Sequence, residues 1–346
     1  MLLSAVDLTA LQHRRKQALA APLVPGTVLA PSGPPLHLSA ITPSREDIVA
    51  LPTGTLEFVV ASTNPYRPPL ADLRSIVTSA SGPRSLRLRL LRLLCGGEDS
   101  WTQVWQAEAT SNGKKLGKVV VKLVAEALFP DWTEDGFWQP ANEAVEAESR
   151  AYSAFRPVQG RDVPHCYGAF SFEMPCGEFV TGLLLEDLSE SSKRVITHCR
   201  EEREAGSYAS LDQVDLLMDT AYRQLHRLQE LGVTSLDLSP GDLLVLNSSD
   251  RLSSLMHLVY LDFGGTKDAD TLDRELRQRE EEMQRELGPW QGIDELLLQQ
   301  LFVDLVPDAA SEWMSREGRE SRVGLWMFMA EEELEEGDET DVDSEE

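Results

Sequence analysis

Three charged side chains, far apart in the sequence, have the types and local settings needed to handle a phosphate group and its counter-ion. Lys122 ends a run of three valines, Asp237 follows a long amphipathic stretch, and Asp262 follows an apolar run and precedes Phe-Gly. A lysine ammonium can bind phosphate oxygens, and a carboxylate at a turn can bind a hard cation such as Mg²⁺. A second loop carboxylate can orient an attacking hydroxyl. This combination is typical of phosphoryl transfer.

Each of the three residues also has an ordinary structural explanation when it is considered alone. Lys122 could be an edge lysine whose stem covers apolar surface while its ammonium reaches water. Asp237 could close a turn or cap a helix, and Asp262 could be a polar turn residue after a strand. The hypothesis of a shared site therefore depends on the elements that would bring the three residues together.

The elements around Lys122 are predicted to form a small antiparallel sheet with one helix. Apolar and basic residues alternate at the start of this region, which is typical of a half-buried strand. Asn112-Gly113 is a strong hairpin signal. Alanines at helical spacing predict the helix at 141–155. Five strands are expected, at residues 86–90, 103–109, 118–124, 167–173 and 178–185.

A second, helical part is predicted after residue 188. Its clearest helix is 211–231, which has one continuous apolar face and ends at Gly232. A highly charged helix is expected at about 272–287, and an apolar helix at about 293–306.

The proline-rich segment 1–85 shows no sustained periodicity, so it is predicted to be peripheral and partly disordered. Within it, a short helix is expected near 8–19 and a strand at 56–61. The chain is therefore divided into a peripheral segment, a sheet-containing unit, a helical unit and an acidic tail. Their expected boundaries are 1–85, 86–188, 189–325 and 326–346.

Taken in order, these motifs resemble the nucleotide-handling parts of the protein-kinase-like superfamily, including its divergent fungal-type and aminoglycoside-phosphotransferase-like members. The resemblance rests on Val-Val-Val-Lys at 119–122, Gly-Val-Thr-Ser-Leu-Asp-Leu at 232–238 and Leu-Asp-Phe-Gly at 261–264. It covers about residues 86–305. It implies a two-lobed α+β fold, with a five-stranded antiparallel N-lobe that carries one helix and a reduced helical C-lobe.

The resemblance also implies roles for the charged residues. Lys122 would hold the α- and β-phosphates of ATP and pair with a glutamate of the next helix, where Glu148 fits best because it shortly precedes Ala-Tyr. Asp237 would be the catalytic residue that orients the acceptor hydroxyl. Asp262 would bind Mg²⁺, and Asp242 would be the second metal ligand in a place where the family usually has asparagine.

Other positions of the resemblance are weaker or altered. Gly96 and Gly97 are what remains of a glycine-rich phosphate loop, and two acidic residues that would repel a triphosphate follow them. Glu186 lies in the segment that would link the lobes and meet the adenine. Ser235 stands where the family has a loop histidine, and Ser239 stands where a lysine or histidine is usual.

The expected function is that of a divergent kinase-like protein that binds ATP and Mg²⁺ and transfers the γ-phosphate to a hydroxyl. The acceptor, a protein or a small molecule, is left open, and no Ala-Pro-Glu sequence follows Asp262 to build a peptide-docking segment. The alternative is a weak or inactive pseudokinase that acts as a binding or scaffold module. The serines in place of functional residues and the poor glycine loop favour that alternative.

Charge and composition exclude some partners. The 346 residues are 42% hydrophobic, enough for a sizeable core, and 58 acidic against 32 basic residues leave a net charge of −26. Nucleic acid and anionic membrane surfaces are therefore not expected partners. Residues 331–346 hold 11 of the acids and are expected to be disordered; they are either a solvated charge run or an arm that binds a protein partner.

The sequence favours a cytoplasmic or nuclear location. The N-terminus lacks the apolar stretch and cleavage site of a secretory signal, and no apolar run approaches the length of a membrane helix. The four cysteines show no C-x-x-C spacing, so zinc ligation is not expected and a reducing compartment is the simplest interpretation.

Overall fold

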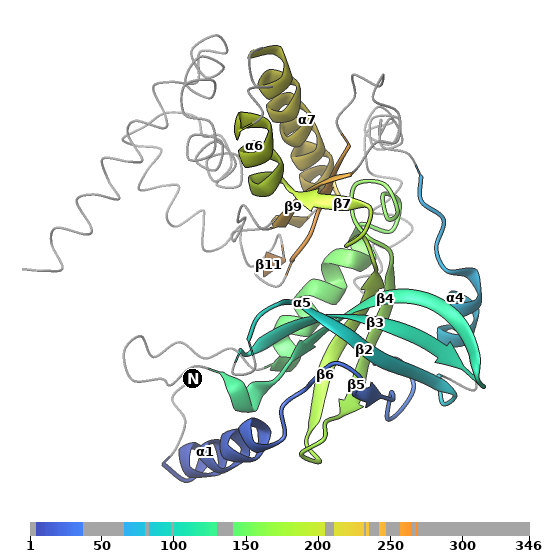
Figure 1. The fold of residues 1–346 in the computed structure, drawn as a ribbon, viewed down its shortest axis with the longest axis vertical. Coiled ribbons are helices and arrows are strands. Elements are labelled where there is room, and N and C mark those ends of the chain that lie inside the picture. Colours follow the sequence, from blue (N-terminus) through green and yellow to red (C-terminus); the bar gives the residue numbers. More distant parts are fainter. Residues whose placement is uncertain are drawn as a thin grey trace, which may run out of the picture.

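The structure is a computed structural model with a mixed α+β fold, built around a curled six-stranded antiparallel sheet (Figure 1). Five α-helices and two smaller sheets complete the part of the chain that the structure describes. That part comprises residues 5–36, 66–79, 83–97, 100–129, 141–204, 211–231, 233–234, 242–246, 257–263 and 267–268.

The main sheet has the strand order β1-β2-β3-β4-β6-β5, with every neighbouring pair antiparallel. The predicted hairpin is confirmed, because Asn112 and Gly113 join β3 to β4 with φ angles of 49° and 77°. The six strands are β1 (Val28–Leu29), β2 (Leu86–Cys95), β3 (Thr102–Ser111), β4 (Lys114–Val124), β5 (Cys166–Glu173) and β6 (Phe179–Glu186).

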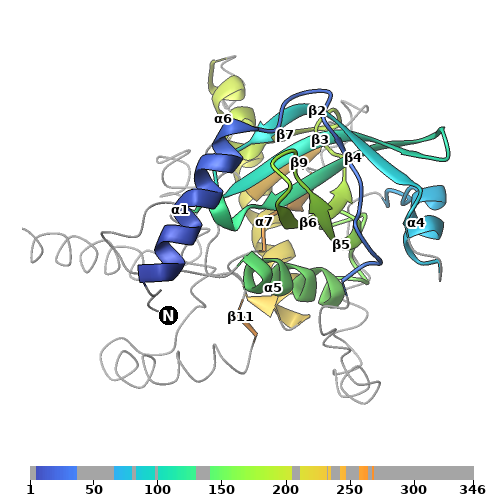
Figure 2. The same ribbon diagram turned by 90° about the horizontal axis from the view of Figure 1, so that it is seen from below.

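The prediction of five strands for this sheet is wrong, because the N-terminal segment adds β1 beside β2. A two-residue strand is too short to show the alternation from which strands are predicted. Residues 28–36 then connect the two edges of the curled sheet: Val28 pairs with Arg89 of β2, and Pro31 forms a bridge with Phe172 of β5. Figure 2 shows this segment in dark blue, running from the end of α1 across the sheet.

The sequence had led us to expect a peripheral N-terminal segment, but the described parts of this segment are packed into the core. Leu23, Leu29, Leu73 and Val77 are all buried, in the hydrophobic cluster that fills one face of the sheet. The expected helix near 8–19 is present as α1 (Ala5–Ala20), and a second short helix is α4 (Ala71–Val77). The expected strand at 56–61 lies outside the described residues.

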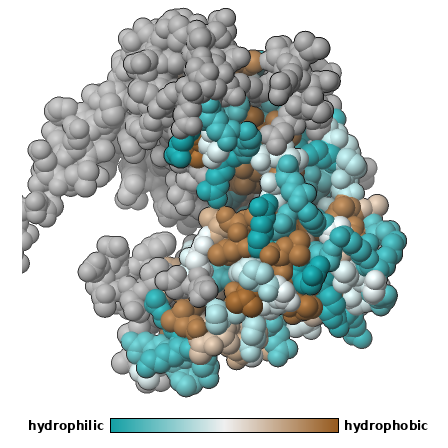
Figure 3. Space-filling view, in the orientation of Figure 1, coloured by the Kyte–Doolittle hydropathy of each residue, from teal (hydrophilic) through white to brown (hydrophobic). Residues whose placement is uncertain are grey.

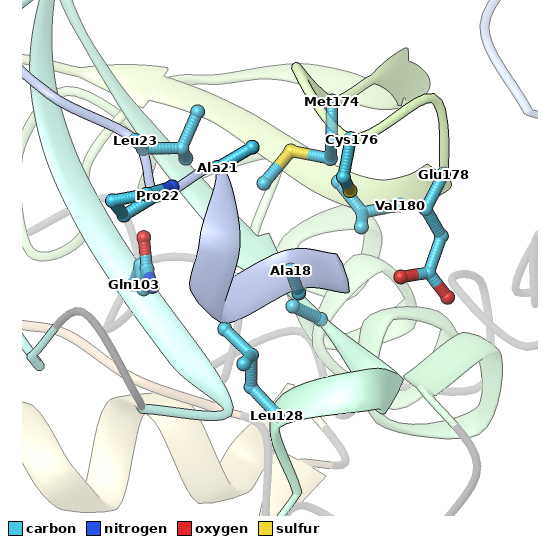
Figure 4. A pocket seen from close by; sticks show the side chains of 11 residues that line it. Ala18, Ala21, Pro22, Leu23, Gln103, Leu128, Met174, Cys176, Glu178 and Val180 are labelled. Atoms are coloured by element: carbon cyan, nitrogen blue, oxygen red, sulfur yellow. The ribbon is translucent and has the colours of Figure 1, made fainter. Parts of the chain in front are cut away.

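Helix α1 docks where the 3₁₀ turn η1 (Glu126–Leu128) follows β4. Arg14 forms ion pairs with Glu126 and Glu178, at 3.5 and 3.1 Å. A small, mostly apolar hollow lies beside this contact, with Met174 and Val180 in its wall (Figure 4). Both residues belong to the cluster on this face of the sheet, so the hollow is part of the packing of α1.

The remaining elements cover the opposite face and one end of the sheet (Figure 1). The helices predicted at 141–155 and 211–231 are confirmed as α5 and α7, but the region after residue 188 also contains short strands. The predicted helices at 272–287 and 293–306, and the acidic tail, lie outside the described residues. The elements are α5 (Ala141–Ala154), β7 (Ser192–Arg194), α6 (Val195–Glu204), α7 (Leu211–Glu230), β8 (Val233–Thr234), β9 (Leu243–Leu246), β10 (Leu258–Tyr260) and β11 (Lys267–Asp268).

Buried polar contacts join the sheet-containing part to α7. The main-chain oxygen of Asp162, in the loop between α5 and β5, accepts a hydrogen bond from the Tyr260 N–H at 2.9 Å. Its side chain is fully buried beside Arg227 and Gln224 of α7, each at 3.3 Å. The Tyr260 hydroxyl donates to the main-chain oxygen of Ala221, also in α7, at 2.8 Å. No helix among the described residues is long and apolar enough to cross a membrane.

Replacing Gly160 by alanine is expected to destabilise the protein by about 3 kcal/mol or more. Gly160 has a φ of +74°, and a Cβ there would lie 2.3 Å from the His165 ring and 2.5 Å from the Arg67 carbonyl. The substitution therefore adds a steric clash to the cost of about 1–2 kcal/mol for a left-handed alanine. Urea unfolding measures the loss.

The matched control is Gly177→Ala, because Gly177 has a φ of +82° and nothing within 4 Å of its added Cβ. It is expected to lose only the conformational part, about 1–2 kcal/mol. Equal losses in the two variants would contradict the close packing of Arg67 and His165 around Gly160.

Candidate functional site

Lys122, Glu148 and Asp262 meet at one point between the sheet and the smaller sheets. The Lys122 Nζ lies 2.8 Å from Glu148 Oε2 and 2.5 Å from Asp262 Oδ1. The side chains of Lys122 and Glu148 are 9% and 3% exposed, whereas that of Asp262 is 49% exposed. The structure thus places three of the predicted site residues together, with one carboxylate buried and the other facing solvent.

Lys122 is held by the middle of the sheet. Its strand, β4, lies between β3 and β6, and Lys122 pairs with Val104 on one side and Leu183 on the other. Side chains alternate along a strand. Val121 and Leu123, the neighbours of Lys122 in β4, therefore point into the hydrophobic cluster on the far face, while Lys122 points toward α5. The backbone that carries the ammonium group is therefore fixed by a paired strand on both sides.

Glu148 is carried on the buried face of α5. Three of its six buried residues are alanines, and Ala144 and Ala151 flank the glutamate one turn away on either side. Small side chains let a helix approach a sheet closely, so the carboxylate reaches the ammonium of Lys122 without leaving the interface. A single glutamate in an apolar face needs such a partner, because an uncompensated buried charge is costly.

Asp262 is positioned by the residue that follows it. Phe263 is 2% exposed and packs edge to face against Tyr152 and Phe155 of the α5 region, with ring centroids 5.3 and 4.8 Å apart. Asp262 itself has a φ of 54°, a left-handed conformation that is strained for a residue other than glycine and is often found at functional sites. The buried ring thus stabilises a turn that directs the carboxylate to Lys122.

The pKa values of Lys122 and Glu148 are shifted by burial and by the charges around them. Burial by itself lowers the pKa of Lys122, but the negative charges of Glu148 and Asp262 more than offset it, so the pKa is raised above its ordinary value. Burial raises the pKa of Glu148, and the Lys122 ammonium opposes that shift. With all three groups ionised, the cluster carries one excess negative charge on its exposed side, where it can attract a cation.

The main chain of Asp242 lies beside that of Leu261, the residue before Asp262. Its main-chain oxygen accepts a hydrogen bond of 2.7 Å from the N–H of Leu261, directly before Asp262. Among the residues that the structure describes, however, no three His, Cys, Asp or Glu side chains are grouped as metal ligands. The predicted metal role of Asp242 and Asp262 therefore stays a prediction.

The turn at Gly96 and Gly97 differs from an open phosphate cradle. Gly96 has a φ of +89°, and an added Cβ would lie 2.4 Å from the Thr102 carbonyl, so the turn between β2 and β3 needs glycine for tight closure. The N–H of Gly97 already donates to the Ser100 hydroxyl at 2.6 Å. That amide binds a phosphate only if Ser100 moves.

The Glu186 side chain is already used for a structural contact. Its two carboxylate oxygens accept hydrogen bonds from Arg67 Nε and Nη2, at 2.8 and 3.3 Å, and one of them also accepts from the His165 N–H. Arg67 additionally donates to the main-chain oxygen of Arg161 at 3.1 Å. Sequence reasoning missed Arg67 because it lies in the segment predicted to be peripheral, and no local pattern marks it.

Asp237, the predicted catalytic residue, lies outside the described residues, as do Ser235 and Ser239. Sequence reasoning also missed a polar cluster at the end of β6, formed by Gln106 and Asp187 with two neighbours.

Comparison with known proteins adds no family: the chain matches no family model, and no curated protein matches it.

Replacing Lys122 by methionine is expected to destabilise the protein by about 3–5 kcal/mol at pH 8, because Glu148 would stay buried without its cation. Lys118→Met is the control, since Lys118 is on the same strand but pairs with the exposed Glu190. It should cost about 1 kcal/mol or less. Urea unfolding measures both, and the double variant Lys122→Met/Glu148→Leu should recover much of the loss.

The destabilisation should also depend on pH. The folded-state pKa of Glu148 is raised, so its contribution to stability is greatest below the ordinary glutamate pKa and falls as pH rises through the folded value. Without Lys122 the folded pKa rises further, and Lys122→Met should lose more stability than wild type between pH 5 and pH 8. If the unfolding free energies of the two proteins changed in parallel with pH, Glu148 would not be energetically coupled to Lys122.

Proposed function

We propose that this chain is a divergent protein-kinase-like protein that binds ATP with Mg²⁺ and transfers the γ-phosphate to a hydroxyl of a protein or small-molecule acceptor. The observation that carries the proposal is the contact of one buried lysine with two carboxylates from distant elements, Glu148 on α5 and Asp262 after β10. Such an arrangement fixes a positive charge beside an exposed acid, as binding of a phosphate and its metal requires.

In this proposal Glu148 keeps the Lys122 ammonium in place, and the ammonium can donate to phosphate oxygens. Asp262 suits a hard cation, because its carboxylate is half exposed and lies in a cluster with excess negative charge. Mg²⁺ would neutralise charge on the phosphates when bound. Asp237 would orient the acceptor hydroxyl, and Asp242 would be a further oxygen ligand.

We assign the same family to the fold as part of the proposal. The sheet with α5 would be the N-lobe, and α6, α7 and the small sheets would belong to the C-lobe, with Glu186 at the connection between them. The order of the elements supports this assignment: the strand with Lys122 precedes the helix with Glu148, two strands follow, and Asp262 comes after α7.

A pseudokinase is the second candidate. One observation favours it: the Gly97 amide, which a phosphate would need, is bonded to Ser100. The serines at 235 and 239 agree with it. A protein of this kind would keep the ion pair and the fold but would act by binding, with the acidic stretch 331–346 as an arm for a protein partner.

A cytoplasmic or nuclear location belongs to the proposal as well. None of the four cysteines, Cys95, Cys166, Cys176 and Cys199, forms a disulfide in the structure. Cysteines without disulfide bonds agree with a reducing compartment, where ATP is also available.

Binding is tested by thermal unfolding with ATP, with and without Mg²⁺. Wild type is expected to be stabilised only by the magnesium complex, by about 2.7 kcal/mol at a ligand concentration 100 times Kd. Asp262→Asn should lose most of this gain. The control is Asp72→Asn, because Asp72 is also an exposed carboxylate paired with a lysine, Lys114 at 2.6 Å, but lies on α4. The absence of any shift in wild type would overturn the proposal.

Catalysis is tested by release or transfer of the γ-phosphate from labelled ATP. Asp237→Asn is expected to lower turnover by about 10²-fold or more while it leaves the magnesium-dependent thermal shift in place, because the residue would act on the acceptor and not on ATP. Binding without measurable turnover in wild type would select the pseudokinase instead.

A further inference from the structure

Basic side chains gather on one face of β2, β3 and β4, toward the end of the sheet where the hairpin joins β3 to β4. Two rows of paired residues cross the three strands there. Figure 3 shows mostly hydrophilic side chains over this end of the sheet, next to α4. One row consists of Arg87, Thr110 and Lys115, and the next of Arg89, Glu108 and Lys118. Together with Arg92, farther along β2, the four cations of these rows form what we call the basic face.

The cations of the basic face lie close to one another and to solvent. Neighbouring strands are about 4.8 Å apart, and successive rows on one face of a sheet are about 7 Å apart. The three arginines and Lys115 are exposed, and the side chain of Lys118 is 39% exposed. A single extended anionic segment could therefore contact several of the cations at once.

Local carboxylates neutralise only part of the positive charge. Glu108 lies between two of the cations, where it contacts Arg89 at 2.7 Å and also Lys115. One carboxylate is thus shared by two bases. Lys118 contacts Glu190, whose side chain is 63% exposed.

The other two cations have no acidic partner within the described part of the chain. The guanidinium group of Arg87 donates to main-chain oxygens, and that of Arg92 donates to Gln106 and Ser189. In a protein with 58 acidic and 32 basic residues, an exposed face with an excess of cations reverses the sign of the overall charge. Such a face fits an anionic partner.

The chain itself carries a segment of the required charge. Residues 331–346 contain 11 acidic residues and no lysine or arginine. Residues 269–330, which are 62 in number, separate this segment from Asp268, the last described residue. A chain of that length can reach any part of the protein surface. Because the two groups share one chain, the effective concentration of the acidic segment stays well above that of a separate partner at micromolar concentration.

We infer that the acidic segment 331–346 docks on the basic face of the same molecule. The attraction is between exposed charges, so it is electrostatic and weakens as salt screens it. This inference does not depend on the proposed function. It assigns the acidic segment to a surface of its own chain, in place of a separate protein partner.

Zero-length cross-linking with a carbodiimide tests the contact on the full chain, because the reagent joins a lysine amine to a carboxylate that touches it. Links from Lys115 and Lys118 to residues 331–346 are expected at about 0.1 M NaCl. They should fall about fivefold or more at about 1 M, where the Debye length is about 3 Å instead of about 10 Å. Mass spectrometry identifies the linked peptides, and the link between Lys193 and Glu201, which lie 2.5 Å apart, is the internal standard.

The double variant Arg87→Gln/Arg89→Gln removes two cations of the basic face and leaves both reactive lysines in place. Its links from Lys115 and Lys118 to the acidic segment are expected to fall about fivefold relative to the standard, since an exposed ion pair contributes modestly. Arg156→Gln/Arg223→Gln is the matched control: it removes the same charge from two exposed arginines, after α5 and on α7. Its links should equal those of wild type.

An equal mixture of ¹⁵N-labelled and unlabelled protein distinguishes docking within one molecule from docking between two. Linked peptides that are both labelled or both unlabelled support the inference. Pairs of mixed label would show that the segment docks on a second copy, which overturns it. It is also overturned if residues 331–346 form no link to Lys115 or Lys118 at low salt, or if the two double variants reduce the links equally.

Discussion

The ion pair between Lys122 and Glu148 is the interaction on which the arrangement of the site depends. Both side chains are almost fully buried, and a buried charge without its partner is strongly destabilising. The pair therefore requires α5 to lie against β4 at one register, with its alanines in contact with the sheet. Since Phe263 packs on the same helix region, the docking of α5 also determines where Asp262 lies.

The N-terminal segment stabilises the other side of this arrangement. Residues 28–36 connect β2 to β5 across the curled sheet, and Leu29 is buried in the cluster behind Lys122. Arg67 binds Glu186 where β6 leaves the sheet. The strand that carries Lys122 is thus packed against the N-terminal segment on the face opposite to the ammonium group. The end of β6 is fixed by Arg67, a residue more than a hundred positions earlier in the chain.

The site combines features that favour phosphate binding with features that limit it. Asp262 presents a half-exposed carboxylate in a cluster with excess negative charge, which attracts a cation. The amide of Gly97 and the polar groups of Gln106 are already bonded within the protein. In the proposed function, phosphate affinity would therefore come from charge, and the Gly97 amide would contribute only if Ser100 moves.

The sequence by itself determined the elements with a strong local pattern: the hairpin at Asn112-Gly113 and the helices α5 and α7. Its residues also singled out Lys122 and Asp262, and the family resemblance added Glu148. Alternation, helical periodicity and positive-φ turn residues are local properties, so they can be read without the fold. Only the tertiary structure decided that β1 joins the sheet, that Arg67 binds Glu186 and that Gln106 donates a hydrogen bond to Asp187. These contacts join residues distant in sequence, and their energy depends on burial and register, which no local pattern specifies.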